Sequence, residues 1–345
     1  MAHAELESIV TLAAALARAQ QLHRQDGGSE AVFDALDSVE RAIFAHKAAF
    51  GVQSERFQRG CEEFLLLAST AAMQALHRRC LGPDASLTTV QRCGDLLLRA
   101  EQHTRRAGYL RTLPSEGHAT HRLALRFTCL NNLACYYKQV DKPWAAVACL
   151  EKALKLQLRQ GRASPSKEEK EEDQDEDDEE EDSDAAASPA AMAATGRVYT
   201  IALTRLNLAA VLSQLQRHTA AADHAKAAVA ELVSAAETGG DARNSAELLV
   251  VAYYNLAVEL EHGGERVKAR DIYERALQVA ARHSLSMGLV EYIREILAES
   301  TGRRAKTKTR TPRSEVAAAP STSPSRRSPR RPLSPHSLRQ LCGSS

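Results

Sequence analysis

Aromatic residues are scarce in this chain, at 4% of 345 residues with a single Trp. Gly and Pro are also sparse before residue 300, and no segment alternates Val, Ile or Thr with polar residues as a strand would. No run of about 18 apolar residues occurs, so nothing predicts a membrane span. A chain dominated by Ala, Leu and Arg, with few turn formers, is typical of an all-helical protein.

Cysteine patterns that would indicate disulfides or zinc are also missing. The seven cysteines are odd in number, include no CxxC pair, and mostly lie within helical patterns. Small core residues of a reduced protein behave in this way. The first residues lack a cationic start followed by an apolar core, so we expect no secretory signal and a cytoplasmic location.

Signatures of catalysis are absent as well. The sequence holds no GxxxxGK[ST], GxSxG or HExxH motif and no paired carboxylates in an ordered context. His118 and His121 are spaced for one helix face but lack a third ligand, so no metal site is expected. Cys135 and Cys149 fall on apolar helix faces, where burial makes a thiol inert. We therefore expect neither an enzyme nor a cofactor.

Two blocks of opposite charge hide behind a net charge of +1. From Glu168 to Asp184 there are 14 acidic residues against one Lys, a net of −13, and from Gly302 to Ser345 there are 11 Lys and Arg against one Glu, a net of +10. Like charges at this density oppose a packed core. We predict a disordered acidic insertion over residues 161–195 and a disordered basic tail over residues 302–345.

One short pattern recurs three times in the remaining chain: L-N-N-L-A-C-Y-Y from Leu130, R-L-N-L-A-A-V-L from Arg205 and Y-Y-N-L-A-V-E-L from Tyr253. Each copy is followed by a helix with Ala-x3-bulky-x2-Ala or a similar small-residue spacing. Such helix pairs are too small to bury their apolar faces alone and must stack on their neighbours.

The rest of the helical pattern divides the chain into segments. Residues 1–116 predict four helices with a degenerate copy of the repeat, and residues 117–160 form the first clear repeat. Residues 196–301 hold the second and third repeats and a closing helix from Ser286 to about Glu299, which would cover the exposed face of the last repeat.

These units resemble the tetratricopeptide repeat, with its W-x2-L-G-x2-Y…A-x3-F…A pattern. Their L-N-N-L-A motif and longer period are similar to the repeats of kinesin light chains. The second copy is weaker because Arg205 stands where a large apolar residue is usual. The resemblance implies an all-α, right-handed solenoid of antiparallel helix pairs that works as a protein-binding scaffold. The first copy fills all seven positions, with Leu130, Leu133, Ala134, Tyr137, Ala146, Leu150 and Ala153.

Three asparagines occupy one slot of the repeat, at Asn132, Asn207 and Asn255. The resemblance places this slot in the concave groove, where a carboxamide could pair with the C=O and N–H of an extended partner peptide. The alternative is that each Asn bonds a neighbouring repeat or faces solvent. The residues expected to add specificity around them are Tyr136, Lys138, Arg205 and Tyr254.

Two further features bear on ligands. The Lys and Arg clamp that chaperone-binding members use for a terminal carboxylate is not evident, so we predict no chaperone partner. Trp144 follows Pro143 at a helix start, where it is expected to pack rather than to anchor a ligand.

The basic tail is rich in Ser, Pro and Arg, and four of its residues precede proline: Thr311, Ser323, Ser328 and Ser334. These are candidates for phosphorylation, which would cancel positive charge. An extended cationic arm suits polyanions such as the microtubule surface, nucleic acid or the acidic insertion of this chain. The simpler alternative is a solvated tail without a dedicated partner.

The leading hypothesis is a cytoplasmic scaffold that binds a partner peptide in its groove, with a cytoskeletal or ciliary association through the tail. The alternative is a nuclear or nucleic-acid-associated protein that binds polyanions through the tail, although no RNA-binding aromatics or zinc spacing support it. A third hypothesis is self-inhibition, in which residues 168–184 cover the tail or the groove.

Overall fold

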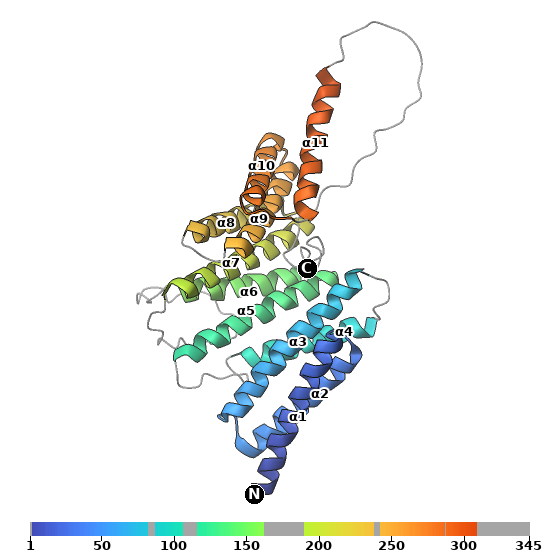
Figure 1. Cartoon of the computed structure of the whole chain (residues 1–345), viewed down its shortest axis with the longest axis vertical. Helices are drawn as coiled ribbons and strands as arrows, with labels where there is room; N and C mark the ends of the chain where they lie inside the picture. The colour runs from blue at the N-terminus through green and yellow to red at the C-terminus, as the bar shows by residue number, and fades with distance from the viewer. Residues whose placement is uncertain are drawn as a thin grey trace. The chain divides into compact units, whose positions relative to one another are not determined.

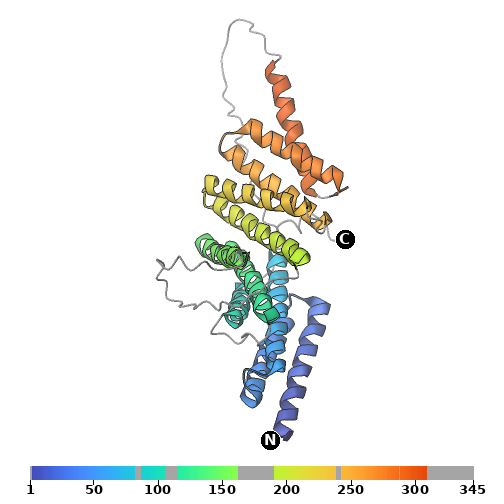
Figure 2. The same ribbon diagram turned by 90° about the vertical axis from the view of Figure 1, so that its left-hand side faces the viewer.

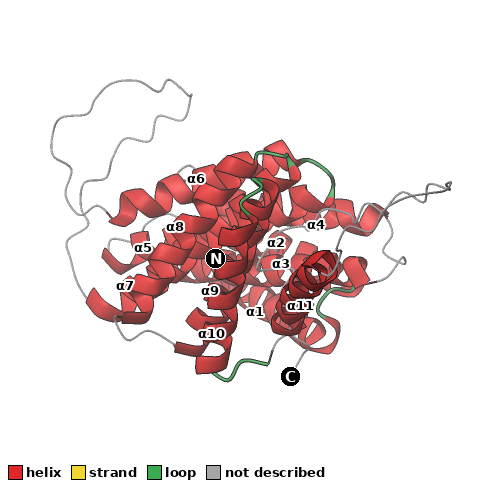
Figure 3. Ribbon diagram, turned by 90° about the horizontal axis from the view of Figure 1, so that it is seen from above, coloured by secondary structure: helices red, strands yellow, loops and turns green. Residues whose placement is uncertain are grey.

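The computed structural model describes residues 2–81, 87–105, 116–161, 190–237, 242–286 and 288–308. Every regular element in these ranges is an α-helix (Figure 3). The chain divides into two compact units, Met1–Ser188 and Pro189–Ser345, which are described separately below. The prediction of an all-α array of paired helices of the tetratricopeptide type is confirmed.

Among its described residues, unit 1 holds six helices, and helices that follow each other in sequence pack against one another (Figure 1). They share one core that extends from Leu12 of the first helix to Leu133 of the fifth. The fifth helix packs on both the third and the fourth, so residues 1–116 continue into the first clear repeat. The helices are α1 (Ala2–Asp26), α2 (Glu30–Phe50), α3 (Glu55–Leu81), α4 (Leu87–Thr104), α5 (Glu116–Gln139) and α6 (Pro143–Gly161).

The described part of unit 2 holds five helices, and α9 contacts each of the other four (Figure 2). The last helix packs on α9 and α10 and buries Leu289, Ile293 and Ile296, as predicted for a closing helix. The helices are α7 (Ala190–Gln214), α8 (His218–Glu237), α9 (Ala242–His262), α10 (Arg266–Arg282) and α11 (Gly288–Lys308).

The three repeats share one turn. The last consensus residue of the first helix is Tyr137, Leu212 or Leu260. The fourth residue after it has a positive φ in each repeat: 56° at Asp141, 61° at Gln216 and 80° at Gly264. The next backbone N–H then reaches five residues back, over 2.8 to 2.9 Å, to the carbonyl of that consensus residue. This bond closes a helix C-terminus in the Schellman manner. The shared turn makes the second repeat equivalent to the others although its sequence match is weaker.

The second helix of each repeat packs through the small-residue spacing seen in the sequence. The consensus side chains of α6, α8 and α10 are at most 1% exposed. Small residues at both ends of the spacing let two helices approach closely, and the central residue fills the space between them. These side chains are Ala146, Leu150, Ala153, Ala221, Ala225, Ala228, Ala269, Tyr273 and Ala276.

Two predicted boundaries need correction. α7 begins at Ala190, inside the range assigned to the acidic insertion, and α11 continues to Lys308, inside the range assigned to the basic tail. The extensions read AAMAAT over residues 190–195 and GRRAKTK over residues 302–308. Apart from Gly302 they contain no strong helix breaker, so helix propensity carries each helix past the predicted limit. The remainder of both segments, with Thr311, Ser323, Ser328 and Ser334, lies outside the described residues.

Candidate protein-binding surfaces

The predicted groove residues of unit 1 lie on α5, where all three are half-buried. Asn132 and Tyr136 are four residues apart and share one face of the helix, whereas Lys138, two residues further on, does not. The predicted contribution of Lys138 to peptide specificity stays a prediction. Its ammonium group lies near Cys135, since its charge partly opposes the rise in that thiol's pKa.

Tyr136 extends from α5 across α4. A Cβ built on Gly94 would come within 2.4 Å of Tyr136 Cζ, so the phenol ring occupies the space that any other side chain at position 94 would need. Burial, and then the nearby charge of Asp95, raise the pKa of the Tyr136 hydroxyl. At the far end of α4, Arg122 Nη1 donates to the Thr104 carbonyl over 3.3 Å. These two contacts show that α4 and α5 run antiparallel.

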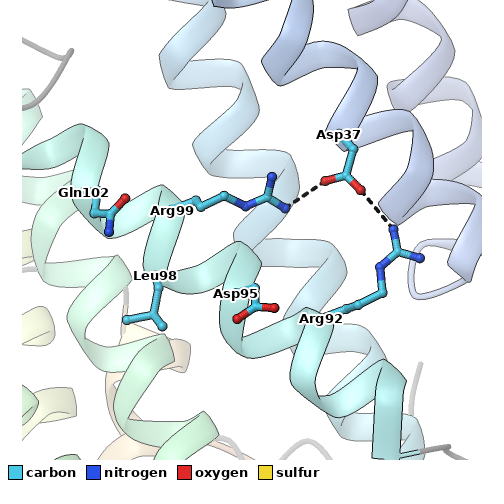
Figure 4. A pocket seen from close by; sticks show the side chains of 6 residues that line it. All are labelled: Asp37, Arg92, Asp95, Leu98, Arg99 and Gln102. Atoms are coloured by element: carbon cyan, nitrogen blue, oxygen red, sulfur yellow. Dashed lines mark hydrogen bonds and ion pairs between the residues drawn. The ribbon is translucent and has the colours of Figure 1, made fainter.

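An antiparallel register places a polar row of α4 beside the Asn132 face of α5. Asp95 and Gln102 are exposed and Leu98 is half-buried, at the three- and four-residue spacing of one helix face. They line a hollow of about 500 Å³ (Figure 4). We call Asp95, Leu98, Gln102, Asn132 and Tyr136 the α4–α5 surface. It offers a carboxylate, two carboxamides, a phenol and one apolar side chain.

The other wall of the hollow is an ion-pair ladder between α2 and α4. Asp37 accepts from both arginines, at 3.1 Å from Arg92 Nη2 and 2.8 Å from Arg99 Nη2 (Figure 4). Arg92 also contacts Glu30 and Asp34, and the guanidinium lies 5.4 Å from the centre of the Phe33 ring.

Arg99 continues the ladder to Glu40, and His103 lies 3.7 Å from the same carboxylate. Burial alone would raise the pKa of Glu40, but the hydrogen bond from His103 and the charge and hydrogen bond of Arg99 outweigh it and lower the pKa. Sequence reasoning missed this ladder. Its signal was present, because acids on α2 and bases on α4 recur at helical spacing, but no pattern showed that the two faces meet.

In unit 2 the predicted groove residues are mostly buried. Asn255 is 0% exposed, Tyr254 is 2% exposed and Asn207 is 7% exposed. The Tyr254 ring lies 6.1 Å from that of Tyr273 and 6.2 Å from that of Tyr292 on α11. A partner peptide cannot reach Tyr254 or Asn255 in this arrangement, so their assignment to an open groove is wrong. α9 is covered by its neighbours, and these side chains belong to the core.

Arg205, which replaces the large apolar residue usual at this position of the repeat, forms an ion pair. Its Nε donates to Glu231 Oε1 of α8 over 2.8 Å, and both side chains are less than one quarter exposed. Burial raises the pKa of Glu231, and the Arg205 charge only partly opposes it. Burial and the same charge lower the pKa of His224. Arg205 therefore stabilises the α7–α8 pair, and its predicted contact with a peptide stays a prediction.

A second buried polar cluster joins α8 to α9. His218 Nδ1 lies 2.8 Å from Glu259 Oε2, and the His218 ring stacks on His262 with centroids 4.0 Å apart. The Glu259 side chain is 0% exposed, and its Oε1 has no hydrogen-bond partner among the described residues. This cluster fixes the end of α9 against the start of α8.

Trp144 corrects another prediction. The side chain is 61% exposed at the start of α6, so it does not pack there. The consensus small residues of α6 already fill the space against α5, which leaves the indole outside.

The cysteine prediction can be examined at five positions. Burial raises the pKa of the Cys61, Cys93 and Cys129 thiols to about 12, and that of Cys135 and Cys149 to about 11. Thiols with such pKa values are poor nucleophiles at neutral pH, as expected for core cysteines.

Two other kinds of site are missing from the described ranges. No group of three or more His, Cys, Asp or Glu side chains there could hold a metal ion, and no helix there has the length and apolarity needed to cross a bilayer. His118 and His121 lie in α5, at positions where the side chains are outside the description.

Taken with the shared turn and the buried small-residue spacing, the stacked helix pairs define a helical-repeat protein. Residues 127–159 match the family model of the tetratricopeptide repeat. This match spans parts of α5 and α6, the first clear repeat of the sequence. A similar solved structure is that of BtubC (BKLC) from P. vanneervenii, with 14% identity over 93% of this chain and 99% of that chain and a TM-score of 0.42. No curated protein sequence matches the chain. Repeats of this kind are typically non-catalytic protein-interaction modules.

Proposed function

We propose that this protein is a non-enzymatic scaffold that binds an extended segment of a partner protein along the α4–α5 surface. The observation that carries the proposal is the contact of Tyr136 with α4 at Gly94, beside the exposed Asp95 and on the same α5 face as Asn132. Carboxamides bond the N–H and C=O of an extended chain without regard to its side chains. Asp95 beside them favours a Lys or Arg side chain in the peptide.

The remaining groove positions of the sequence prediction contribute less. Asn207 and Asn255 are too buried to bond a peptide, and Arg205 is paired with Glu231. The proposed contact therefore concentrates in unit 1 rather than extending over all three repeats. The adjacent Arg92 and Arg99 are held by the α2 carboxylates, which keeps the wall of the hollow in place.

The test is a selection of peptides from a random library on the purified full-length chain, followed by anisotropy measurements with the selected peptides. Losing one hydrogen bond of about 1 kcal/mol should weaken binding roughly five-fold in Asn132→Ala. Asp95→Asn should reduce the salt dependence of binding. Asn131→Ala is the matched control, because Asn131 Nδ2 donates to the Phe127 carbonyl of its own helix over 3.0 Å.

Equal affinity of the wild type, Asn132→Ala, Tyr136→Ala and Asp95→Asn for every selected peptide would contradict the proposal. Circular dichroism melts of all four proteins would separate a loss of binding from a loss of folding.

We further propose that the basic tail contacts a polyanion, with the microtubule surface as the first candidate. Its net charge of +10 over residues 302–345 supports this contact. Co-sedimentation with microtubules should decrease steeply between about 50 and 200 mM salt. It should weaken strongly when residues 309–345, which carry seven of the eleven Lys and Arg, are deleted. Equal co-sedimentation with and without the tail would exclude it, and binding to duplex DNA alone would favour the nucleic-acid alternative.

A further inference from the structure

The outward face of α6 combines exposed aromatic, aliphatic and basic side chains in one row. Trp144 is 61% exposed at the start of the helix, and Leu158 is 41% exposed near its end. At 100° per residue, the exposed positions between them fall on the same side of the helix. We call this row the α6 strip: Trp144, Ala148, Glu151, Lys152, Lys155, Leu158 and Arg159.

The opposite side of α6 is already occupied. Ala146, Leu150 and Ala153 are fully buried, and within unit 1 this helix packs against α5. The strip is therefore not needed to hold the repeat together. An indole exposed by more than half is unusual for a side chain with so large an apolar area. Beside it stand three cations and one carboxylate, a net charge of +2.

We propose that the α6 strip is the docking site for the acidic segment Glu168–Asp184 of the same chain. This segment has a net charge of −13 and begins seven residues after α6 ends at Gly161. Its carboxylates are opposite in charge to Lys152, Lys155 and Arg159, which are exposed on the strip. The only strongly acidic run of the sequence is thus covalently attached to the end of the helix that carries the basic strip.

Length and tethering allow the contact. α6 is about 28 Å long at 1.5 Å per residue, whereas an extended chain of 17 residues covers about 55 Å. The segment can turn after Gly161 and run back towards Trp144. Because it is tethered, its effective concentration at the strip is on the order of millimolar, which makes weak ion pairs sufficient.

Other occupants fit less well. An anionic membrane surface would favour a broad apolar face, but the strip has only two large apolar side chains and includes Glu151. The basic tail has the wrong sign of charge for this strip. These occupants become outcomes of the test below.

Trp144 is the only Trp of the chain, so its fluorescence reports on the strip directly. We would compare acrylamide quenching, which is insensitive to charge, in the full-length wild type and in a variant with every Asp and Glu of residues 168–184 changed to Asn and Gln. We expect quenching about two-fold weaker in the wild type at low salt, and a loss of this difference near 0.5 M salt, where charges are screened beyond about 4 Å.

A triple variant tests the other partner of the contact. Lys152→Glu, Lys155→Glu and Arg159→Glu together should expose Trp144 as fully as neutralising the acidic segment does. The matched control reverses three exposed arginines of α1 and α2, namely Arg18, Arg24 and Arg41, and should leave quenching as in the wild type.

Equal quenching in the wild type and in the neutralised variant would overturn the proposal. It would also be overturned if the acidic segment protected Trp144 equally well after charge reversal on α6. If the segment instead paired with the basic tail, deletion of residues 309–345 would change quenching and reversal on α6 would not. The strip would be assigned to membranes by two results together. The wild type and the neutralised variant would co-sediment equally with phosphatidylserine vesicles, and the charge-reversed triple variant would not co-sediment.

Discussion

The ring of Tyr136 on α5 lies against the backbone of Gly94 on α4, with no room for a β-carbon between them. This contact sets the separation of two helices that belong to neighbouring pairs. It also fixes where the phenol stands on the α4–α5 surface. The glycine therefore serves the approach of two helices rather than a turn.

Changing Gly94 to Ala should displace the Tyr136 ring and reduce stability by about 1–3 kcal/mol through overpacking. In a Tyr136→Ala background the same change should become neutral or stabilising by up to about 1 kcal/mol, because Ala is the better helix former. Urea unfolding of the four proteins of this double-mutant cycle measures the coupling. If Gly94→Ala lowered the free energy of unfolding equally in both backgrounds, the new methyl group would not be clashing with the Tyr136 ring.

Asn255 and Asn132 should separate into different roles although they occupy the same slot of the repeat. Asn255→Ala removes a fully buried polar side chain and should cost about 1–3 kcal/mol in unfolding. Asn132→Ala changes a half-buried side chain and should alter stability by less than about 0.5 kcal/mol. Thermal or urea unfolding of both variants measures the difference. If all three asparagines lined an open groove, the two substitutions would change stability equally.

The lowered pKa of Glu40 predicts a dependence of stability on acid. Its ionised form is favoured by folding, so its contribution is complete above the ordinary pKa of 4.5 and is lost as the pH decreases through the lower folded pKa. Glu40→Gln should therefore flatten the decline in the urea midpoint below about pH 5. Glu7→Gln, which changes an exposed carboxyl of α1, is the control. An identical acid limb in the wild type and in Glu40→Gln would contradict the assignment.

The five thiols with raised pKa values should resist modification in the folded chain. At pH 8 a thiol of pKa 11 to 12 is on the order of 10² to 10³ times less ionised than a free thiol of pKa 8.5, and burial adds steric protection. With Cys80 and Cys342 changed to Ser, a disulfide exchange reagent should give almost no signal until denaturant is added. Rapid modification of any thiol in the native chain would show that its helix opens locally.

The sequence was sufficient for the helices and for the repeat unit, because hydrophobic periodicity and turn residues are local properties. Gln216 shows how far this extends: a residue with no special turn propensity adopts the same positive φ as Asp141 and Gly264, because the flanking helices impose it. The register of three repeats could thus be read from one short pattern.

Exposure was harder to predict than helix position. From Ser245 to Glu259 every residue of α9 except Glu247 is buried, so the helix has no polar face from which a groove could be inferred. Tyr254 was assigned to a ligand site because it precedes Asn255, whose slot the resemblance places in the concave groove, but its ring packs against Tyr292 of α11. The error for Trp144 has the opposite sign. Its position at a helix start led to a prediction of packing, but the filled α5–α6 contact leaves the indole exposed. Both errors come from long-range neighbours that no local pattern contains.

The enclosure of α9 by four other helices also determines the order in which unit 2 can come apart. Its backbone amides have no route to solvent unless helices that contact it are first removed, so they should exchange hydrogen only at the rate of complete unfolding of the unit. The final helix, with one side exposed, should exchange earlier. Because α9 contacts every other helix of the second unit, a substitution at Asn255 or Glu259 should change the stability of the whole unit rather than of one repeat.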